Sequence, residues 1–185
     1  MQELLTELTN YQPANELEQK HYQKVIDFLK TNQNQFRREN LAGHIVGGAF
    51  LLSPDFKKVL FTHHEEYNRW LQLGGHADGE ENILNVALRE AEEESGISGI
   101  KPFNENIFDV DAHFIPKNER KNEPEHYHYE IRYVLVAPTT DYSISNESNA
   151  LKWFSVEEME EYQWGDSISR MVKKWKKAIN TEDSF

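Results

Sequence analysis

The spacing of apolar residues at the start of the chain predicts two helices. Residues 1–8 place methionine and leucine at helical intervals, which is typical of an amphipathic helix with one buried face. Pro13 interrupts that pattern, because proline cannot continue the hydrogen-bond ladder of a helix. A second helical pattern follows and runs to about residue 31, and Asn15 together with Glu18 can cap its first turn.

Strands are expected over much of the remaining chain. Residues 44–52 are mostly apolar and predict a buried strand, and Ser53-Pro54-Asp55 predicts a turn into a second strand at residues 59–61. Ser155 and Glu158 form the pattern of a capping box, and a last helix is expected around the apolar residues between 168 and 175. Further strands are expected near residues 107–115, 126–137 and 152–154.

This order of strands and helices favours an α/β fold with a mixed sheet. A chain of 185 residues is long enough for one domain with one core. We expect residues 1–40 to be a helical extension packed on a domain formed by residues 41–185. The extension could pack on the domain, shape a substrate pocket or form a dimer contact, so a homodimer is one expected alternative.

One helical segment concentrates carboxylates on a single face. Glu90, Glu93 and Glu94 stand at positions i, i+3 and i+4, so on a helix their like charges repel. A solvated face is the simpler interpretation of such a run. However, Gly74-Gly75 can bring backbone carbonyls close to a ligand, and Gly96 supplies a helix stop. Clustered oxygen ligands suit Mg²⁺ or Mn²⁺. The apolar stripe of this helix is expected to consist of Leu84, Ala87, Leu88 and Ala91.

The segment from Gly75 to Ile97 resembles the Nudix box, with every fixed position filled. So many constrained positions make the resemblance specific. It implies a Nudix-type α/β/α sandwich with a mixed β-sheet, and a pyrophosphohydrolase acting on phosphorus anhydrides. Leu73 departs from the family pattern, which often has proline before the two glycines. The matching positions are, in order, Gly75, five residues, Glu81, seven residues, Arg89-Glu90, apolar Ala91, one residue, Glu93-Glu94, one residue, Gly96 and apolar Ile97.

The resemblance also implies a role for individual residues. Glu90, Glu93 and Glu94 are the expected metal ligands, and the carbonyl of Gly74 is a further one. Arg89 would orient a carboxylate for catalysis. The Mg²⁺ or Mn²⁺ ions would neutralise charge on phosphate oxygens and lower the pKa of the attacking water.

The general base has two candidates, because the family places this residue variably. Glu147 lies in a polar run six residues before Trp153, where loops before the last strand can carry a catalytic or metal-binding acid. A solvated loop acid is the other interpretation of Glu147. Glu93, inside the box, is the competing catalytic base.

Two segments outside the box carry polar strand faces. In residues 126–132 polar side chains alternate with Tyr127, Tyr129 and Ile131, and residues 109–113 alternate likewise. Two such faces in one sheet favour a substrate pocket or an accessory metal site, and a water-facing sheet surface is the alternative. Candidate substrate-binding residues are Arg69, His76, His113, His126, His128, Glu130 and Arg132.

Composition excludes several function classes. A net charge of −12 argues against nucleic acid as a partner. The chain has no cysteine, so it cannot use the catalytic cysteine of isopentenyl-diphosphate isomerases, which share the Nudix fold. No apolar run is long enough to cross a bilayer, and the first residues lack the basic start of a secretory signal. We therefore expect a cytoplasmic protein without a membrane partner.

The expected partner is a small-molecule nucleoside diphosphate derivative, such as a nucleotide sugar, ADP-ribose or a nucleoside triphosphate. Pro116 lies close to the downstream proline of ADP-ribose hydrolases but out of register with it, so the sequence identifies no subfamily. The alternative is a non-catalytic Nudix-fold regulator that binds a nucleotide without turnover. The complete acidic triplet favours the enzyme, because a sensor would be free to lose metal ligands.

Overall fold

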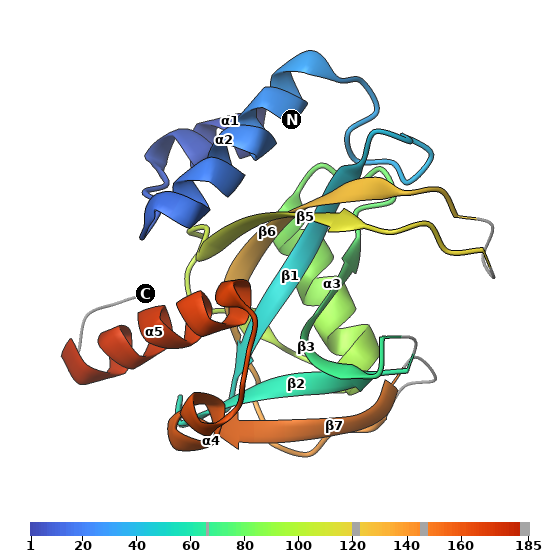
Figure 1. Ribbon diagram of the computed structural model, residues 1–185. Helices are drawn as coiled ribbons and strands as arrows, with labels where there is room; N and C mark the ends of the chain where they lie inside the picture. The colour runs from blue at the N-terminus through green and yellow to red at the C-terminus, as the bar shows by residue number, and fades with distance from the viewer. Residues whose placement is uncertain (66, 120–122, 145–147, 182–185) are drawn as a thin grey trace. The chain divides into compact units, whose positions relative to one another are not determined.

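The computed structural model (Figure 1) describes residues 1–65, 67–119, 123–144 and 148–181. Among these residues, no helix is both long enough and apolar enough to span a membrane. The helices are α1 (Gln2–Asn10), α2 (Glu16–Thr31), α3 (Ile83–Ser95), α4 (Val156–Glu161) and α5 (Asp166–Thr181). The strands are β1 (His44–Leu52), β2 (Lys58–His64), β3 (Arg69–His76), β4 (Lys101–Pro102), β5 (Asp109–Ile115), β6 (His126–Val136) and β7 (Ser148–Ser155).

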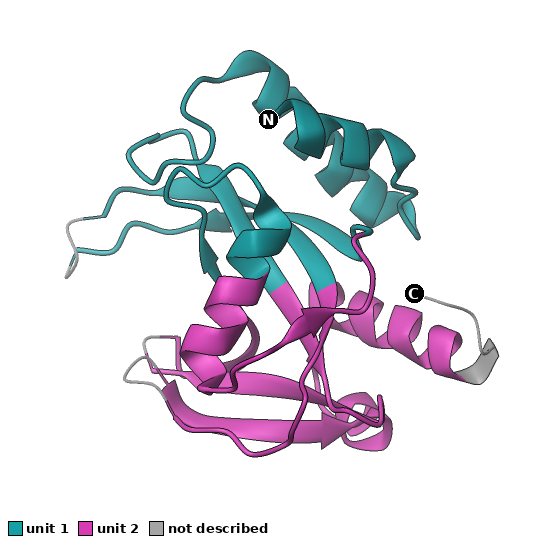
Figure 2. Ribbon diagram, turned by 180° about the vertical axis from the view of Figure 1, so that it is seen from behind, with its two compact units in different colours: residues 1–48, 74–87, 106–133 teal, residues 49–73, 88–105, 134–185 magenta. Residues whose placement is uncertain are grey.

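The seven strands form a sheet in the order β4-β6-β1-β3-β2-β7, and β5 pairs with β6. This arrangement confirms the predicted α/β fold class and the N-terminal helices. The chain divides into two compact units, coloured separately in Figure 2. Unit 1 comprises residues 1–48, 74–87 and 106–133, and unit 2 comprises residues 49–73, 88–105 and 134–185. The expected division at residue 40 stays a prediction.

In unit 1 the two N-terminal helices are tied to strands by specific contacts. The backbone amide of Glu18 donates to Oδ1 of Asn15 at 2.9 Å, which confirms the predicted cap of α2. The Glu18 carboxylate is fully buried and accepts a hydrogen bond from the amide of Val110 in β5 at 3.3 Å. Phe28 of α2 stacks on Tyr129 of β6, with ring centroids 4.0 Å apart. The N-terminal segment is therefore part of the core of unit 1.

The antiparallel pair of β5 and β6 separates aromatic from polar side chains. Asp111 lies opposite Glu130, and His113 lies opposite His128, so the polar residues of both strands share one face. On the other face, the Tyr133 hydroxyl donates to Oε2 of Glu7 in α1 at 2.7 Å. The predicted alternation is confirmed, and the two strands pair directly in the sheet.

Unit 2 is built around β2, which pairs with β3 and with β7 in antiparallel fashion. Trp175 of α5 is fully buried, and its ring centroid lies 5.7 Å from that of Phe50 in an edge-to-face contact. At the end of β7, the amide of Glu158 donates to Oγ of Ser155 at 3.3 Å and the amide of Ser155 donates to the Glu158 carboxylate at 2.8 Å. The predicted capping box is therefore present, and it begins the short helix α4.

Candidate functional site

Helix α3 presents the predicted carboxylates beside a single guanidinium. Nη1 of Arg89 donates to Oε1 of Glu90 at 2.6 Å and to Oε2 of Glu93 at 3.4 Å. The three acidic side chains differ in exposure: Glu94 is 7% exposed, whereas the Glu93 side chain is 60% exposed and that of Glu90 is 15% exposed. Arg89 therefore contacts two of the carboxylates, and its orienting role stays a prediction.

The buried stripe of α3 differs in part from the predicted one. Ala87 and Ala91 are fully buried as expected, but Leu84 and Leu88 are only half-buried. Val86 is fully buried instead. The buried face is therefore centred on the small alanines, and the two leucines flank it.

Gly96 ends α3 as predicted. Its φ angle is +67°, which glycine adopts without steric cost, and its amide donates to the carbonyl of Glu92 at 2.9 Å. A Cβ atom at this position would lie 1.9 Å from Oγ of Ser143. Both the backbone conformation and the lack of space therefore require glycine here.

Gly74, the predicted backbone ligand, makes a close backbone approach within unit 1. Its φ angle is +150°, and a Cβ atom there would lie 2.4 Å from the carbonyl oxygen of Gly47. Gly48 is also crowded, since its Cβ would lie 2.6 Å from Oε1 of Glu130. Strand β1 therefore uses glycine where it passes β3 and where it passes the Glu130 carboxylate.

A buried ionic network surrounds Arg132 on the polar face of β6. Nη1 of Arg132 donates to Oδ1 of Asp109 at 2.8 Å, and Nη2 donates to Oε2 of Glu130 at 2.5 Å. A third carboxylate, that of Asp111, lies 3.7 Å from Nη2, and all four side chains are buried. Burial alone would lower the pKa of Arg132, but the three carboxylates raise that pKa above its ordinary value. The guanidinium is therefore charged.

The carboxylate of Asp111 also lies within hydrogen-bond distance of two imidazoles. Nδ1 of His21 lies 2.5 Å from Oδ1 of Asp111, and Nδ1 of His113 lies 3.0 Å from Oδ2. Burial would raise the pKa of Asp111, but the hydrogen bonds to His113 and His21 and the charge of Arg132 hold it well below its usual range. His113 is therefore anchored to a carboxylate that is ionised.

Four histidines gather next to this network in unit 1, and we call them the histidine cluster: His44, His76, His126 and His128. The ring centroid of His44 lies 4.9 Å from that of His76, 4.8 Å from that of His126 and 4.9 Å from that of His128. The Nε2 atoms of His126 and His128 are 3.1 Å apart. The imidazole nitrogens therefore converge on one small volume.

Burial keeps two imidazoles of the histidine cluster neutral, those of His44 and His128. Loss of hydration, followed by the neighbouring imidazoles, lowers the pKa of His44 from 6.5 to about 3 and that of His128 to about 2. At neutral pH both rings carry a lone pair that can accept a hydrogen bond or bind a metal ion.

The structure brings six of the seven predicted substrate-binding residues together in unit 1, and Arg69 is the exception. Arg69 belongs to unit 2, where its guanidinium lies 5.5 Å from the ring centroid of Tyr67. Glu147 lies outside the described residues. The residues that gather in unit 1 are His76, His113, His126, His128, Glu130 and Arg132.

Four residues of this region were not singled out as site residues from the sequence: His21, His44, Asp109 and Asp111. His44 opens an otherwise apolar strand, and a polar ring at a position expected to be buried is the signal that would have identified it. His21 and Asp109 join the network through contacts across 90 and 23 positions of sequence, respectively. No local pattern predicts such contacts.

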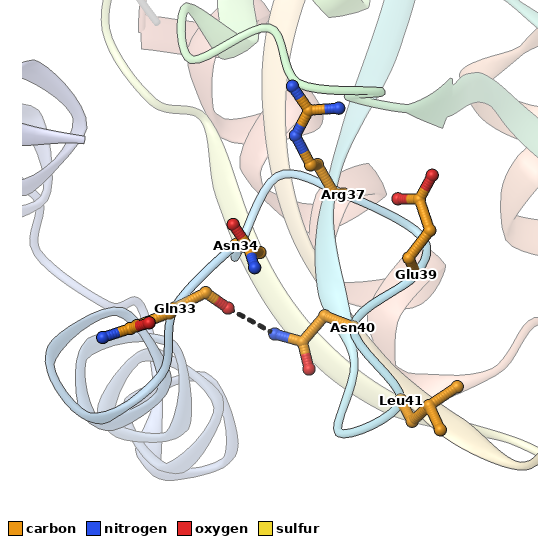
Figure 3. A pocket seen from close by; sticks show the side chains of 6 residues that line it. All are labelled: Gln33, Asn34, Arg37, Glu39, Asn40 and Leu41. Carbon is orange, nitrogen blue, oxygen red and sulfur yellow. Dashed lines mark hydrogen bonds between the residues drawn. The ribbon is translucent and has the colours of Figure 1, made fainter.

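A surface pocket of about 450 Å³ lies in the loop between α2 and β1. Figure 3 shows its lining side chains, with the Asn40 amide donating to the carbonyl of Gln33 at 3.0 Å. The lining offers one guanidinium, one carboxylate and amides, all from a single loop. The pocket is therefore formed by one loop, and none of the predicted site residues lines it. Its lining residues are Gln33, Asn34, Arg37, Glu39, Asn40 and Leu41.

Comparisons with known proteins agree on one family. A family model described as the NUDIX domain matches residues 44–175. A probable DHNTP pyrophosphohydrolase of Lactococcus lactis is 32% identical over 113 residues. That alignment covers 60% of this chain and 66% of the relative, which is just under two thirds of the relative's length.

Solved structures share the fold at low sequence identity. The dihydroneopterin triphosphate pyrophosphohydrolase of E. coli has a TM-score of 0.54 at 16% identity, covering 70% of this chain and 92% of that chain. The NUDIX domain of Shewanella oneidensis NrtR, solved with ADP ribose, has a TM-score of 0.53 at 13% identity, covering 83% and 97% of the two chains.

Proposed function

Because this chain belongs to the Nudix family of hydrolases, we propose that it hydrolyses the phosphoric anhydride linkage of a small-molecule nucleoside diphosphate derivative, with Mg²⁺ or Mn²⁺ as cofactor. The observation that carries the proposal is the arrangement on α3, where Arg89 lies against Glu90 and Glu93. The three carboxylates of this helix face provide the hard oxygen donors that these ions prefer.

The oxygen chemistry of the donors on α3 supports such an ion, although their ligand atoms are not among the groups of described residues that lie within 4.8 Å of one another. Glu90, Glu93 and Glu94 would hold it, with the Gly74 carbonyl as the proposed backbone ligand. When bound, the ion would supply positive charge to the phosphate oxygens and lower the pKa of the attacking water. Arg89 would keep the Glu90 and Glu93 carboxylates in their orientation, since it already contacts both. The protein's task is then mainly positioning and charge, as phosphoryl transfer requires.

A carboxylate would take the proton from the attacking water. Glu93 is one candidate, because its side chain is 60% exposed and so can be reached from solvent. Glu147 is the other candidate. The water oxygen forms a bond to phosphorus, the bond from phosphorus to the bridging oxygen breaks, and the proton moves to the carboxylate.

The candidate substrate-binding residues differ in how far their side chains are exposed to solvent. Glu130, Arg132 and His126 are buried and already hydrogen-bonded, so they support other side chains. His113 and Arg69 are more exposed, so a ligand can reach either of them from solvent without rearrangement. We propose His113 of unit 1 and Arg69 of unit 2 as separate candidates for contact with phosphate oxygens.

A substrate panel tests the reaction. The panel contains ADP-ribose, a nucleotide sugar, a nucleoside triphosphate and dihydroneopterin triphosphate, the last because the names of two relatives point to it. Each compound is incubated with the protein and Mg²⁺ or Mn²⁺, and the products are identified by chromatography. We expect metal-dependent cleavage between phosphorus atoms of at least one compound.

The same panel distinguishes the enzyme from a nucleotide-binding regulator. The NrtR domain solved with ADP ribose shows that a protein with this fold can hold a nucleotide derivative. If the protein binds a panel member in calorimetry but forms no product with either metal, the hydrolase proposal fails and the regulator is the remaining function.

A further inference from the structure

We propose that His44, His76 and His128 bind one divalent transition-metal ion of the Zn²⁺ class, at a site chemically distinct from the carboxylates of α3. One ring nitrogen of each residue lies within 4.8 Å of the corresponding nitrogen of the other two. Three imidazoles from β1, β3 and β6 therefore converge on a common point in unit 1. The site belongs to no step of the proposed hydrolysis.

The spacing is close to that of a metal centre. With Zn–N bonds of about 2.0–2.1 Å, a tetrahedral ion sets its nitrogen ligands ~3.3 Å apart. Side chains whose nitrogens lie within 4.8 Å of one another need shifts of roughly 1 Å to reach that geometry. Rotation about the side-chain bonds of His76 and His128, which are only half-buried, supplies such shifts and leaves a path for an ion from solvent.

His44 carries the strongest individual observation. It is 2% exposed, and neither of its ring nitrogens makes a hydrogen bond within the described residues. A buried polar atom that loses its hydration without gaining a hydrogen-bond partner destabilises the folded protein, so such atoms call for an explanation. A metal ion would satisfy one nitrogen of this ring.

His126 places a fourth imidazole beside these three histidines, although it is not one of the residues that meet the spacing. Its Nδ1 atom lies 2.9 Å from the carbonyl oxygen of Pro124, which places the proton on Nδ1 and leaves the lone pair on Nε2. That Nε2 atom is 3.1 Å from Nε2 of His128, close to the ~3.3 Å edge of a tetrahedral site. A backbone carbonyl that fixes the tautomer of a ligating histidine is typical of metal centres.

The chemistry of the donors selects the ion. Neutral imidazole suits Zn²⁺, Cu²⁺ and Ni²⁺, whereas Mg²⁺ prefers oxygen. Burial holds His44 and His128 in their neutral form, which is the ligating one. A second group, formed by Asp111, His113 and Glu130, also meets the spacing, but its carboxylates are engaged by Arg132 and His21. We therefore assign the ion to the histidines.

The test uses the full chain without a histidine tag, stripped of metal by a chelator. Co²⁺ is titrated into the protein, and the intense visible absorption of tetrahedral Co²⁺ is followed, with Zn²⁺ then added as competitor. We expect one equivalent of Co²⁺ to bind, Zn²⁺ to displace it, and excess Mg²⁺ to leave the signal unchanged. His76→Gln and His128→Gln should each weaken Co²⁺ binding by more than the roughly 10- to 100-fold that the loss of an outer hydrogen-bond partner of a metal ligand typically costs.

His63→Gln is the matched control, since His63 is a half-buried strand histidine of β2 in unit 2. It should bind Co²⁺ like the parent protein. The proposal is overturned if the parent binds no Co²⁺ at micromolar concentration, or if both cluster variants bind as tightly as the control.

A measurement on the parent protein guards against variants that fail to fold. Diethyl pyrocarbonate modifies accessible imidazoles, and peptide mass spectrometry locates the modified residues. Zn²⁺ should protect His76 and His128 several-fold and leave His63 unprotected. Equal modification with and without Zn²⁺ would reject the site independently of any substitution.

Discussion

Arg132 donates a 2.8 Å hydrogen bond to Asp109, and both side chains are buried, at 3% and 0% exposure. A buried guanidinium of this kind is stabilising only while its partners remain, because each charge left alone in the interior would be poorly solvated. The carboxylates of Glu130 and Asp111 complete the surroundings of the same cation. The charge balance on the polar face of β5 and β6 therefore depends on the guanidinium of Arg132.

We expect Arg132→Met to lower the free energy of unfolding by about 3–5 kcal/mol, since it leaves buried carboxylates without their cation. Arg38→Met is the matched control, because Arg38 also pairs with a carboxylate, that of Asp78, but both side chains are about half exposed. Its loss should cost about 0–1 kcal/mol. Urea unfolding followed by circular dichroism measures both. Equal losses would show that the buried network contributes no more than a surface pair.

Gly74→Ala should destabilise the protein by at least about 1–3 kcal/mol, the usual range for a residue forced into a sparsely populated backbone region. The added methyl group would meet the Gly47 carbonyl at 2.4 Å, so a local shift of β1 or β3 must accompany it. Gly165→Ala, where a Cβ meets nothing within 4 Å, should change stability little. Thermal unfolding of the two variants side by side is the measurement, and similar melting temperatures would contradict the close approach.

Glu94→Gln should lower turnover of a panel substrate by orders of magnitude while the fold survives, because the change keeps the shape and removes a ligand charge. Glu92→Gln is the control on the same helix: the Glu92 carboxylate accepts the amide hydrogens of Gly99 and Ile100, and a Gln carbonyl can still accept them. Steady-state rates over a series of Mg²⁺ concentrations decide the matter. Near-normal activity of Glu94→Gln at limiting Mg²⁺ would remove Glu94 from the metal ligands.

Glu147→Gln should mainly lower kcat and leave KM nearly unchanged if Glu147 is the general base, because that interaction forms in the transition state. Glu93→Gln provides the comparison, as Glu93 is the competing base. Single-turnover rates measured for both variants separate the chemical step from product release. An unaltered kcat in Glu147→Gln together with a large loss in Glu93→Gln would assign the base to α3.

Local sequence patterns predicted much of this fold. The caps at Asn15 and Ser155 and the stop at Gly96 depend on residues within a few positions of each other, and all three are present. The alternation in β5 and β6 likewise follows from the two-residue period of a strand. Arg89 contacts the next residue, Glu90, and Glu93 one turn further on, and it was the resemblance to the Nudix box that implied an orienting role for it.

Three of the four residues of the histidine cluster, His76, His126 and His128, were candidate site residues from the sequence, and His44 was not. His126 and His128 stand two residues apart in one strand, but His44 and His76 join them from β1 and β3. Such a meeting depends on strand register, which no short pattern specifies. The partial exposure of Leu84 and Leu88 also depends on tertiary structure. The elements that pack on a helix decide which flank of its apolar stripe is covered.

The two faces of β6 have a consequence for how this protein can be altered. Tyr129 and Tyr133 face the helices, and His128 and Glu130 face the other way, so neighbouring positions have opposite surroundings. Inserting or deleting one residue within the strand would send imidazoles into the aromatic core and tyrosines onto the polar face. The length of β6 between His126 and Tyr133 is therefore fixed.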